Sequence, residues 1–147
     1  MKKRLTTILS LIVAIASTGA FAEQSESFGD YTVHYSAFTT DILTAEVAKS
    51  YRIPRSKNRA LLNISVLKKV MGTAGSPVQA KVEATATNLS AQLRELEVRE
   101  LKEHGAIYYI AETAVNNEET LKYSLVITPA GESESFELSF QQQFFTR

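Results

Sequence analysis

The segment 77–87 alternates strictly between small apolar and polar residues, and this alternation constrains the fold more than any other feature of the sequence. Its apolar positions are Val78, Ala80, Val82, Ala84 and Ala86. A period of two is that of a β-strand, in which successive side chains point to opposite faces. One face of this strand is therefore buried and the other faces water, as is typical of an antiparallel sheet packed on one side.

Six further segments are rich in β-branched, aromatic or alternating apolar residues and are separated by polar or glycine-containing turns. Together with the first, they predict seven strands, at residues 30–39, 60–71, 77–87, 93–101, 106–115, 121–127 and 136–144. Such a pattern predicts an all-β domain, namely a two-sheet antiparallel β-sandwich of immunoglobulin-like type, with a closed β-barrel as the alternative. One short helix is expected at residues 44–51, with Thr44 as its N-terminal cap.

The alternation also predicts which side chains form the core. The strands expected at residues 77–87, 93–101, 121–127 and 136–144 have apolar residues at every second position over all or part of their length. Side chains on one face of a strand bury together. We therefore expect a single core formed by Val78, Val82, Leu96, Val98, Leu121, Tyr123, Leu125, Ile127, Phe136, Leu138 and Phe140.

The first 22 residues have the features of a secretory signal peptide. Lys2, Lys3 and Arg4 form a basic head, an apolar run follows, and residues 20–22 (Ala-Phe-Ala) form a small-x-small cleavage site. The apolar run is about 12 residues long and so is shorter than the roughly 20 residues that a membrane span needs. We expect cleavage after Ala22, a periplasmic location with no membrane span, a flexible leader at residues 23–29 and one domain at residues 30–147.

Composition excludes several classes of protein. The chain has no cysteine, which excludes a disulfide scaffold, a thiol nucleophile and a lipid-anchoring cysteine. Removal of the signal peptide takes away three of the 16 basic residues and none of the 16 acidic ones. The resulting negative charge argues against nucleic acid as a partner.

Neither histidine indicates a catalytic or metal site. His34 and His104 do not occur at a spacing typical of zinc ligands. In a strand, Ser36 would share a face with His34 but lie roughly 6–7 Å from it, too far for the direct hydrogen bond between a nucleophile and its base. We therefore expect no catalytic residues, no cofactor and no metal site.

A basic segment follows the expected helix. It consists of Arg52, Arg55, Lys57, Asn58 and Arg59. Arginine side chains suit carboxylates and phosphates, so this segment is a candidate site for an anion or for an acidic partner. The alternative is a solvated connection whose arginines pair with the glutamates of residues 93–101.

Aromatic residues form a second candidate surface, made of Tyr35, Tyr108 and Tyr109. Adjacent residues on a strand point to opposite faces, so either Tyr108 or Tyr109 lies off the core. An outward tyrosine packs against a neighbouring strand or belongs to a patch for a protein or glycan partner.

Several runs of residues together resemble a known family. They are YTVHYSAF at residues 31–38, YRIPRSKNR at 51–59, LNISVL at 62–67, RE at 99–100, AIYYI at 106–110 and FQQQFF at 140–145. The resemblance is to a family of small exported bacterial proteins classed as a domain of unknown function, and it implies an exported β-rich domain without assigning an activity. In that family a proline opens the short helix and a glycine follows its last aromatic residue. Ala45 and Arg52 hold these positions here, so less sharply defined helix ends are expected.

These observations favour a non-enzymatic periplasmic binding or interaction module whose partner is an envelope protein or a cell-wall component. One alternative is an enzyme that processes cell-wall or peptide substrates through a carboxylate pair, for which Glu95, Glu97 and Glu100 are the available residues. The other is a carrier of a small apolar ligand. A carrier needs an internal cavity, an enzyme needs converging carboxylates of raised pKa, and a binding module needs an exposed patch or a free edge.

Overall fold

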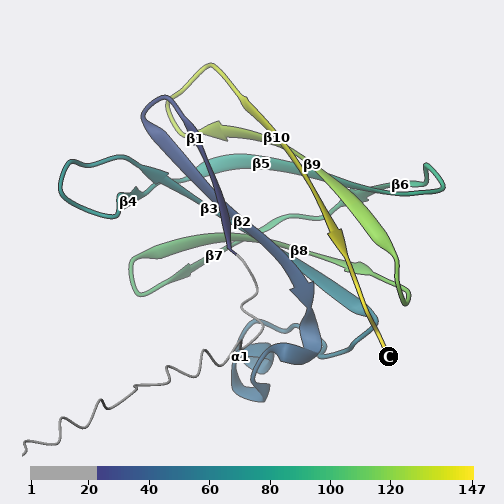
Figure 1. Cartoon of the computed structure of the whole chain (residues 1–147). Coiled ribbons are helices and arrows are strands. Elements are labelled where there is room, and N and C mark those ends of the chain that lie inside the picture. Colours follow the sequence, from purple (N-terminus) through teal and green to yellow (C-terminus); the bar gives the residue numbers. More distant parts are fainter. Residues whose placement is uncertain (1–22) are drawn as a thin grey trace, which may run out of the picture.

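The computed structural model describes residues 23–147, which form two antiparallel sheets packed face to face (Figure 1). Sheet A contains, in spatial order, β1 (Gln24–Phe28), β2 (Tyr31–Thr39), β3 (Arg59–Lys68), β8 (Ala106–Ala114) and β7 (Arg99–Glu103), and the short β4 (Ser76–Pro77) also pairs with β3. Sheet B contains β10 (Phe136–Gln143), β9 (Thr120–Pro129), β5 (Ala80–Asn88) and β6 (Leu93–Leu96). The predicted β-sandwich is confirmed, and the closed barrel is wrong for the described residues because each sheet keeps two edges. The predicted signal peptide, residues 1–22, lies outside the described residues.

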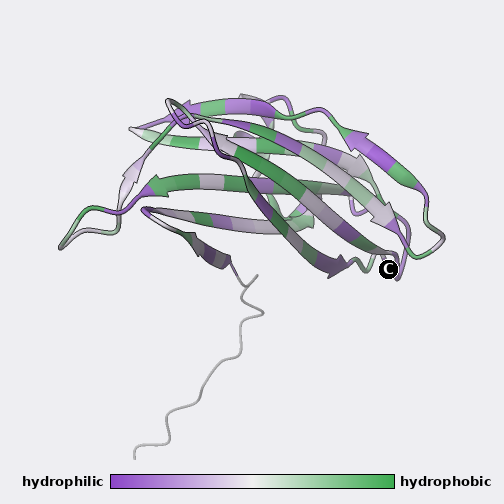
Figure 2. Ribbon diagram, turned by 90° about the horizontal axis from the view of Figure 1, so that it is seen from above, coloured by the Kyte–Doolittle hydropathy of each residue, from purple (hydrophilic) through white to green (hydrophobic). Residues whose placement is uncertain are grey.

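The alternating residues form the core as predicted. Leu121, Leu125 and Ile127 of β9 are almost fully buried between the sheets. Tyr35 and Tyr123 pack against Phe140, with ring centroids 4.6 and 5.1 Å from that of Phe140. Figure 2 shows the corresponding bands of high and low hydropathy along the strands. The remaining predicted core residues pack against this cluster and are partly buried, namely Val78, Val82, Leu96, Val98 and Phe136.

The strand predicted at residues 93–101 is two strands in different sheets. β6 pairs with β5 in sheet B, whereas β7 pairs with β8 in sheet A. The chain changes sheets between Leu96 and Arg99, while Leu96 and Val98 both continue to pack against the core. The alternation of side chains therefore runs through the crossing, and it contains no sign that the hydrogen-bonding partner changes.

The leader predicted at residues 23–29 is also wrong in part, because Gln24–Phe28 form β1. This strand pairs antiparallel with β2, and the ring of Phe28 stacks on that of Phe136 at 4.9 Å. Its residues are mostly polar and exposed. An edge strand of this kind is held by main-chain hydrogen bonds and does not need the apolar alternation from which strands are predicted.

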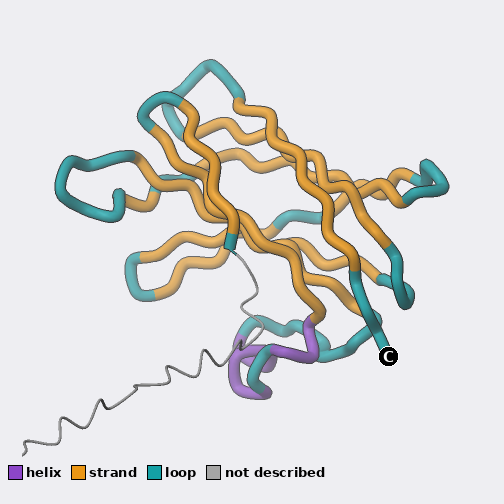
Figure 3. Tube along the Cα trace, viewed as in Figure 1, coloured by secondary structure: helices purple, strands orange, loops and turns teal. Residues whose placement is uncertain are grey.

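Between β2 and β3 the chain leaves the sheet as a helical segment, residues 40–58, which contains the 3-10 turn η1 (Thr40–Ile42) and the helix α1 (Ala45–Ser50). Figure 3 shows that the helices of the described chain lie in this segment. The β3–β4 connection and the β5–β6 hairpin project from other parts of the sandwich. The hydroxyl of Thr44 accepts a hydrogen bond from the Val47 amide, which confirms the predicted cap.

The end of α1 is sharply defined despite the absence of glycine. The amide of Arg52 donates to the Lys49 carbonyl at 3.2 Å, and the amide of Ile53 donates to the Ala48 carbonyl at 2.8 Å. These two bonds form a Schellman motif, in which the residue after the helix adopts the left-handed conformation. Arg52 does so, with φ of 56°. The expectation of a poorly defined helix end is therefore wrong, because Arg52 adopts the backbone conformation that favours glycine.

Candidate functional site

A small apolar cluster lies on the outer face of sheet A, away from the core, and we call it the outer cluster. Its buried members are Ile53, Leu61 and Ile110. Five partly buried side chains pack against them, namely Phe38, Leu43, Tyr51, Leu101 and Tyr108. Strand pairing explains how they meet, because Phe38 lies opposite Leu61 and Leu101 lies opposite Tyr108 in the sheet. The helical segment supplies the other side.

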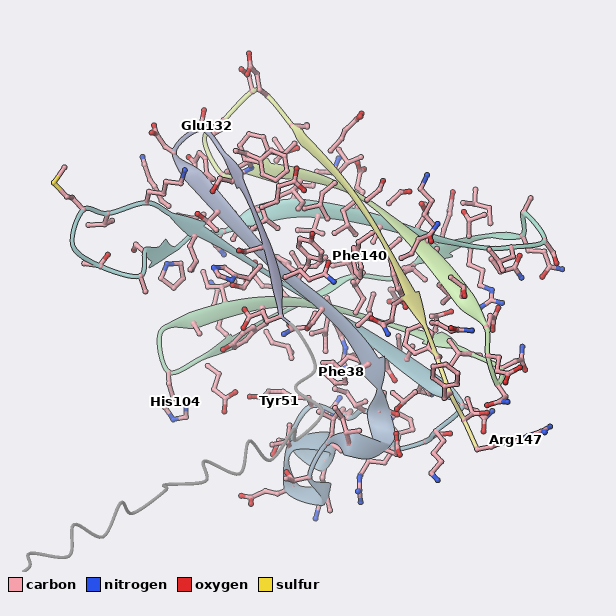
Figure 4. All side chains as sticks on the ribbon, in the orientation of Figure 1. Phe38, Tyr51, His104, Glu132, Phe140 and Arg147 are labelled. Atoms are coloured by element: carbon pink, nitrogen blue, oxygen red, sulfur yellow. The ribbon has the colours of Figure 1, made fainter. Side chains whose placement is uncertain are left out.

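The helical segment does not close over this cluster completely and leaves a pocket of about 270 Å³. Apolar side chains line most of it, and Asn63 and Glu103 add polar groups. The hydroxyl of Tyr51 donates a hydrogen bond to Glu103. Figure 4 shows the labelled side chains of Phe38 and Tyr51 beside the helical segment. The complete lining is Phe38, Leu43, Val47, Tyr51, Ile53, Leu61, Asn63, Leu101, Glu103 and Tyr108.

Hydrogen bonds at its base fix the helical segment to the sandwich. Thr40 is fully buried, and its hydroxyl donates to the Pro54 carbonyl at 2.7 Å and accepts from the Ser56 amide at 2.9 Å. Asn58 exchanges hydrogen bonds with the main chain of Val115, donating from its side chain at 3.3 Å and accepting at its carbonyl at 2.9 Å. These hydrogen bonds therefore fix the position of the helical segment, which forms one side of the pocket.

The five residues of the predicted basic segment do not converge on one point. Arg55 donates to the Asp41 carbonyl at 2.9 Å, and Asn58 has the structural role described above. Arg59 belongs to β3, where it pairs with Glu112 at 3.6 Å rather than with a glutamate of residues 93–101. Within residues 23–147, the side chains of Arg52 and Lys57 have no hydrogen-bonding or ionic partner, and both are exposed. Arg52 lies between Tyr51 and Ile53, which both line the pocket.

The predicted aromatic patch is wrong, because its three tyrosines do not share one face. Tyr35 and Tyr109 are buried in the core, whereas Tyr108 belongs to the outer cluster. The parity expected for adjacent residues is thus confirmed for Tyr108 and Tyr109. Burial raises the pKa of Tyr109, whose hydroxyl accepts from the Ala80 amide at 2.7 Å and donates to Glu100 at 2.9 Å. The tyrosine that does face outward, Tyr108, lines the pocket.

Two carboxyl groups of the described chain have a shifted pKa, and both shifts are downward. The hydrogen bond from Tyr109 lowers the pKa of Glu100. Burial alone would raise the pKa of Glu119, but the Asn116 amide and the Arg94 guanidinium more than offset it and hold the pKa low. A general acid requires the opposite shift. Glu95 and Glu97, the other residues considered for a carboxylate pair, are exposed.

Neither histidine is among the residues that line the pocket. His34 is on β2, where its Nδ1 lies 3.1 Å from a carboxylate oxygen of Glu23. His104 is exposed in the turn between β7 and β8, with φ of 46°. In the described part of the chain, residues 23–147, no three histidine, aspartate or glutamate side chains are grouped so that they could hold a metal ion.

The outer cluster is the part of the site that the sequence patterns missed. Their alternation identifies strands with one buried face. Leu61 and Leu62 are adjacent and point to opposite faces, yet both are buried, and the same holds for Tyr109 and Ile110. A strand buried on both faces has a nearly continuous apolar run, and such runs at residues 60–62 and 106–111 are the signal that could have revealed this cluster.

Comparison with known proteins gives a family and a fold. A family model described as "Domain of unknown function (DUF4426)" matches residues 25–147. A crystal structure of a DUF4426 family protein from Pseudomonas aeruginosa PAO1 is 33% identical, with a TM-score of 0.73, and the match covers 85% of this chain and 96% of that one. A search of curated proteins found no match.

Two structures of FetP from uropathogenic Escherichia coli strain F11 are more distant. One is of FetP "as isolated" after expression in the periplasm (12% identity, TM-score 0.59, covering 84% of this chain and 94% of that one). The other is a copper-bound variant (12% identity, TM-score 0.61, covering 86% and 97%). At this identity the likeness shows a shared fold. Among residues 23–147, no helix is long and apolar enough to cross a membrane.

Proposed function

Because this chain belongs to the DUF4426 family, whose function is unknown, its role has to be inferred from its own surface, and we propose that it is a non-enzymatic binding module of the periplasm. Its partner is a segment of an envelope protein that carries one large apolar side chain beside acidic residues. The apolar side chain enters the pocket of the outer cluster, and the acidic residues meet Arg52 and Lys57. The observation that carries this proposal is an open apolar pocket lined by Tyr51 and Ile53, the two chain neighbours of the exposed and unpaired Arg52.

The size of the pocket favours a protein side chain over a free ligand. Sites for small molecules have volumes of roughly 300–1,000 Å³ and enclose most of the ligand. The pocket of about 270 Å³ lies at the lower limit of that range, and a leucine- or phenylalanine-sized group is small enough to enter it. Binding of a side chain in a pocket is also how the central contacts of many protein interfaces are built. This pocket therefore supports the alternative of a carrier for a small apolar ligand less well.

The exposed cations that follow α1 favour an acidic partner. Acidic residues outnumber basic ones in the described chain, but Arg52 and Lys57 follow α1 as exposed cations without an ionic partner among residues 23–147. Guanidinium groups bind carboxylates well because they donate two parallel hydrogen bonds. The backbone of Arg52 adds to this argument. A residue with a side chain is strained at φ of 56°, so glycine would be more stable here, and strain of this kind is often retained where a side chain has a function.

A location outside the cytoplasm is consistent with the predicted signal peptide at residues 1–22 and with the fold shared with FetP. A rigid sandwich that presents a pocket beside a loop is a common arrangement for binding proteins, because the sheets fix the position of the loop. The hydrogen bonds of Thr40 and Asn58 serve this purpose here.

Peptide titrations followed by NMR test the proposal. The probes are short peptides with one phenylalanine flanked by aspartates, the same peptides with lysines for aspartates, and the same with serine for phenylalanine. We expect the first peptide to shift the methyl resonances of Leu61 and Leu101, and the other two to shift them little. Arg52→Gln should weaken binding about 2- to 5-fold, because an exposed ion pair contributes up to about 1 kcal/mol.

Val47→Asp and Val70→Asp form a matched pair of variants. Both valines are exposed, at 39% and 47%, but Val47 lines the pocket while Val70 follows the far end of β3. We expect Val47→Asp to abolish peptide binding and Val70→Asp to leave it unchanged. Equal binding by the two variants, or equal binding of the aspartate and lysine peptides, would contradict the proposed function.

A further inference from the structure

The edge of sheet B formed by β10 is less protected against pairing than the other sheet edges of the described chain. An exposed strand edge is a template for another strand, and proteins protect such edges by shortness, charge, proline or bulges. β6 has 4 residues, β1 has 5, and four of the five residues of β7 are charged. β10 has 8 residues (FELSFQQQ), contains no proline, and pairs with β9 in an unbroken register. Its single charged residue is Glu137.

The pairing with β9 determines which main-chain groups of β10 remain free. The amide of Phe144, just after the strand, donates to the Glu119 carbonyl at 2.9 Å, so it points toward β9. Amide directions alternate along an antiparallel strand. The amides of Ser139 and Gln141 therefore point away from β9, to the free edge. Side chains at these positions are exposed on the outer face of sheet B.

We propose that a second copy of this chain pairs antiparallel along β10, about a two-fold axis at Phe140, so that the two copies of sheet B become continuous. This proposal is independent of the pocket and goes beyond the proposed function. In this register Ser139 of each copy lies opposite Gln141 of the other, and Glu137 lies opposite Gln143. The two Glu137 carboxylates are therefore kept apart, and the facing side chains are polar and mostly uncharged. Like charges directly opposite each other destabilise strand pairing, and this register avoids them.

A second copy fits this strand, because a two-fold axis at Phe140 places no like charges opposite each other along residues 137–143. A two-fold axis gives each copy the same contacts, and most soluble homo-oligomers have closed symmetry of this kind. Figure 1 shows β10 as the last strand before the C-terminus, at the edge of its sheet.

Sedimentation equilibrium of residues 23–147 tests the proposal. We expect a concentration-dependent mass that reaches twice that of the monomer. Gln141→Pro removes one amide from the free edge without removing a hydrogen bond to β9, and proline is tolerated at such edge positions. This variant should stay monomeric. Gln141→Thr is the matched control, since it changes the same side chain but keeps the amide, and it should still form the dimer.

Amide hydrogen exchange of the unmodified protein is a second test, which does not depend on how the proline variant folds. The amides of Ser139 and Gln141 should exchange rapidly at low protein concentration and become protected as the dimer forms, while the amides that bond to β9 stay protected throughout. A wild-type protein that remains monomeric at millimolar concentration would overturn the proposal. So would a dimer in which the exchange of Ser139 and Gln141 does not change with concentration.

Discussion

The core between the sheets and the outer cluster are both apolar, but they are closed in different ways. In the core, β-strands cover both sides, and Tyr35, Phe140 and Tyr123 pack ring against ring. In the outer cluster, one side is the outer face of sheet A and the other is the irregular helical segment, which leaves a pocket of about 270 Å³. The side chains of the two sheets pack closely against each other in the core. The irregular helical segment packs less closely against the outer face of sheet A, so a pocket remains there. The comparison therefore distinguishes the part of the molecule that stabilises it from the part that we propose to bind.

The largest expected effect is a difference between two identical substitutions, Leu125→Ala in the core and Leu61→Ala in the outer cluster. Both leucines are buried, at 1% and 4% exposure. Leu→Ala in a packed core costs about 2–5 kcal/mol, and the cost grows with the cavity that remains. Leu125 is enclosed by two sheets, so its loss should cost about 3–5 kcal/mol of unfolding free energy. Leu61 borders an existing pocket that water can enter, so its loss should cost about 2 kcal/mol.

Urea denaturation of both variants measures this difference. Phe140→Ala serves as a second core variant and should also fall in the upper range, because large aromatic truncations cost about 3–5 kcal/mol. If Leu61→Ala destabilised as much as Leu125→Ala, the outer cluster would be part of the folding core rather than a binding surface on it.

The contrast between the two clusters also explains how far the sequence predicts this molecule. β9 and β10 have one buried face, so their alternation gives the correct core side chains, including Leu125 and Phe140. β3 is buried on both faces along part of its length, and there the alternation is lost. Which strands pair with each other is not predicted by this alternation. Hydrogen bonding between strands involves the main chain, so the sequence does not show that β6 and β7 belong to different sheets or that the polar residues of β1 form a strand.

The candidate site is predicted in part. The basic segment includes Arg52, whose two chain neighbours line the pocket, but its residues differ in role. Arg59 forms an ion pair with Glu112 of β8, which is distant in the sequence. Asn58 forms hydrogen bonds with the main chain of Val115. Such partners come from tertiary pairing, and local spacing does not reveal them. The backbone conformation of Arg52 follows from the Schellman motif, which the sequence would have indicated had glycine been present.

An intermediate effect is expected from the ion pair between Arg94 and Glu119. Arg94 of β6 donates to Glu119 at 2.7 Å and to the Ala114 carbonyl at 2.8 Å, and Glu119 also accepts from the Asn116 amide at 2.9 Å. These bonds link sheet B to the turn between β8 and β9. The Glu119 side chain is only 10% exposed, whereas the Tyr51–Glu103 contact at the outer pocket is exposed. Hydrogen bonds to a buried charge contribute about 1.5–3 kcal/mol, more than exposed ones do.

The pH dependence of stability should report this pair. The pKa of Glu119 in the folded protein is below its ordinary value of 4.5, so folding favours the ionised form. The stabilisation is therefore present above about pH 4.5 and is lost as the pH falls through the folded pKa. Glu119→Gln should lower the unfolding free energy at pH 7 by about 2 kcal/mol and flatten its dependence on pH below 5. Asn116→Ala keeps the amide donor, so it should retain most of the wild-type dependence. An unchanged acid profile in Glu119→Gln would show that other carboxylates control it.

The smallest expected effect concerns Arg52 and has the opposite sign, since Arg52→Gly should stabilise the protein. The left-handed conformation costs a residue with a side chain roughly 1–2 kcal/mol, and glycine avoids this cost but loses about 0.5–1 kcal/mol through its greater freedom when unfolded. The net gain is expected to be about 0.5–1 kcal/mol, or a rise in Tm of about 2–4 °C. Lys57→Gly is the matched control, because Lys57 is also an exposed cation of the helical segment but does not have a positive φ. Lys57→Gly should lower the Tm, while both variants should weaken binding of the aspartate peptide through loss of a cation.

A gain in stability together with a loss of binding in Arg52→Gly would mean that Arg52 destabilises the helical segment but contributes to the binding site beside it. A gain in stability with unchanged binding would remove Arg52 from that site and leave the apolar pocket alone to account for any binding.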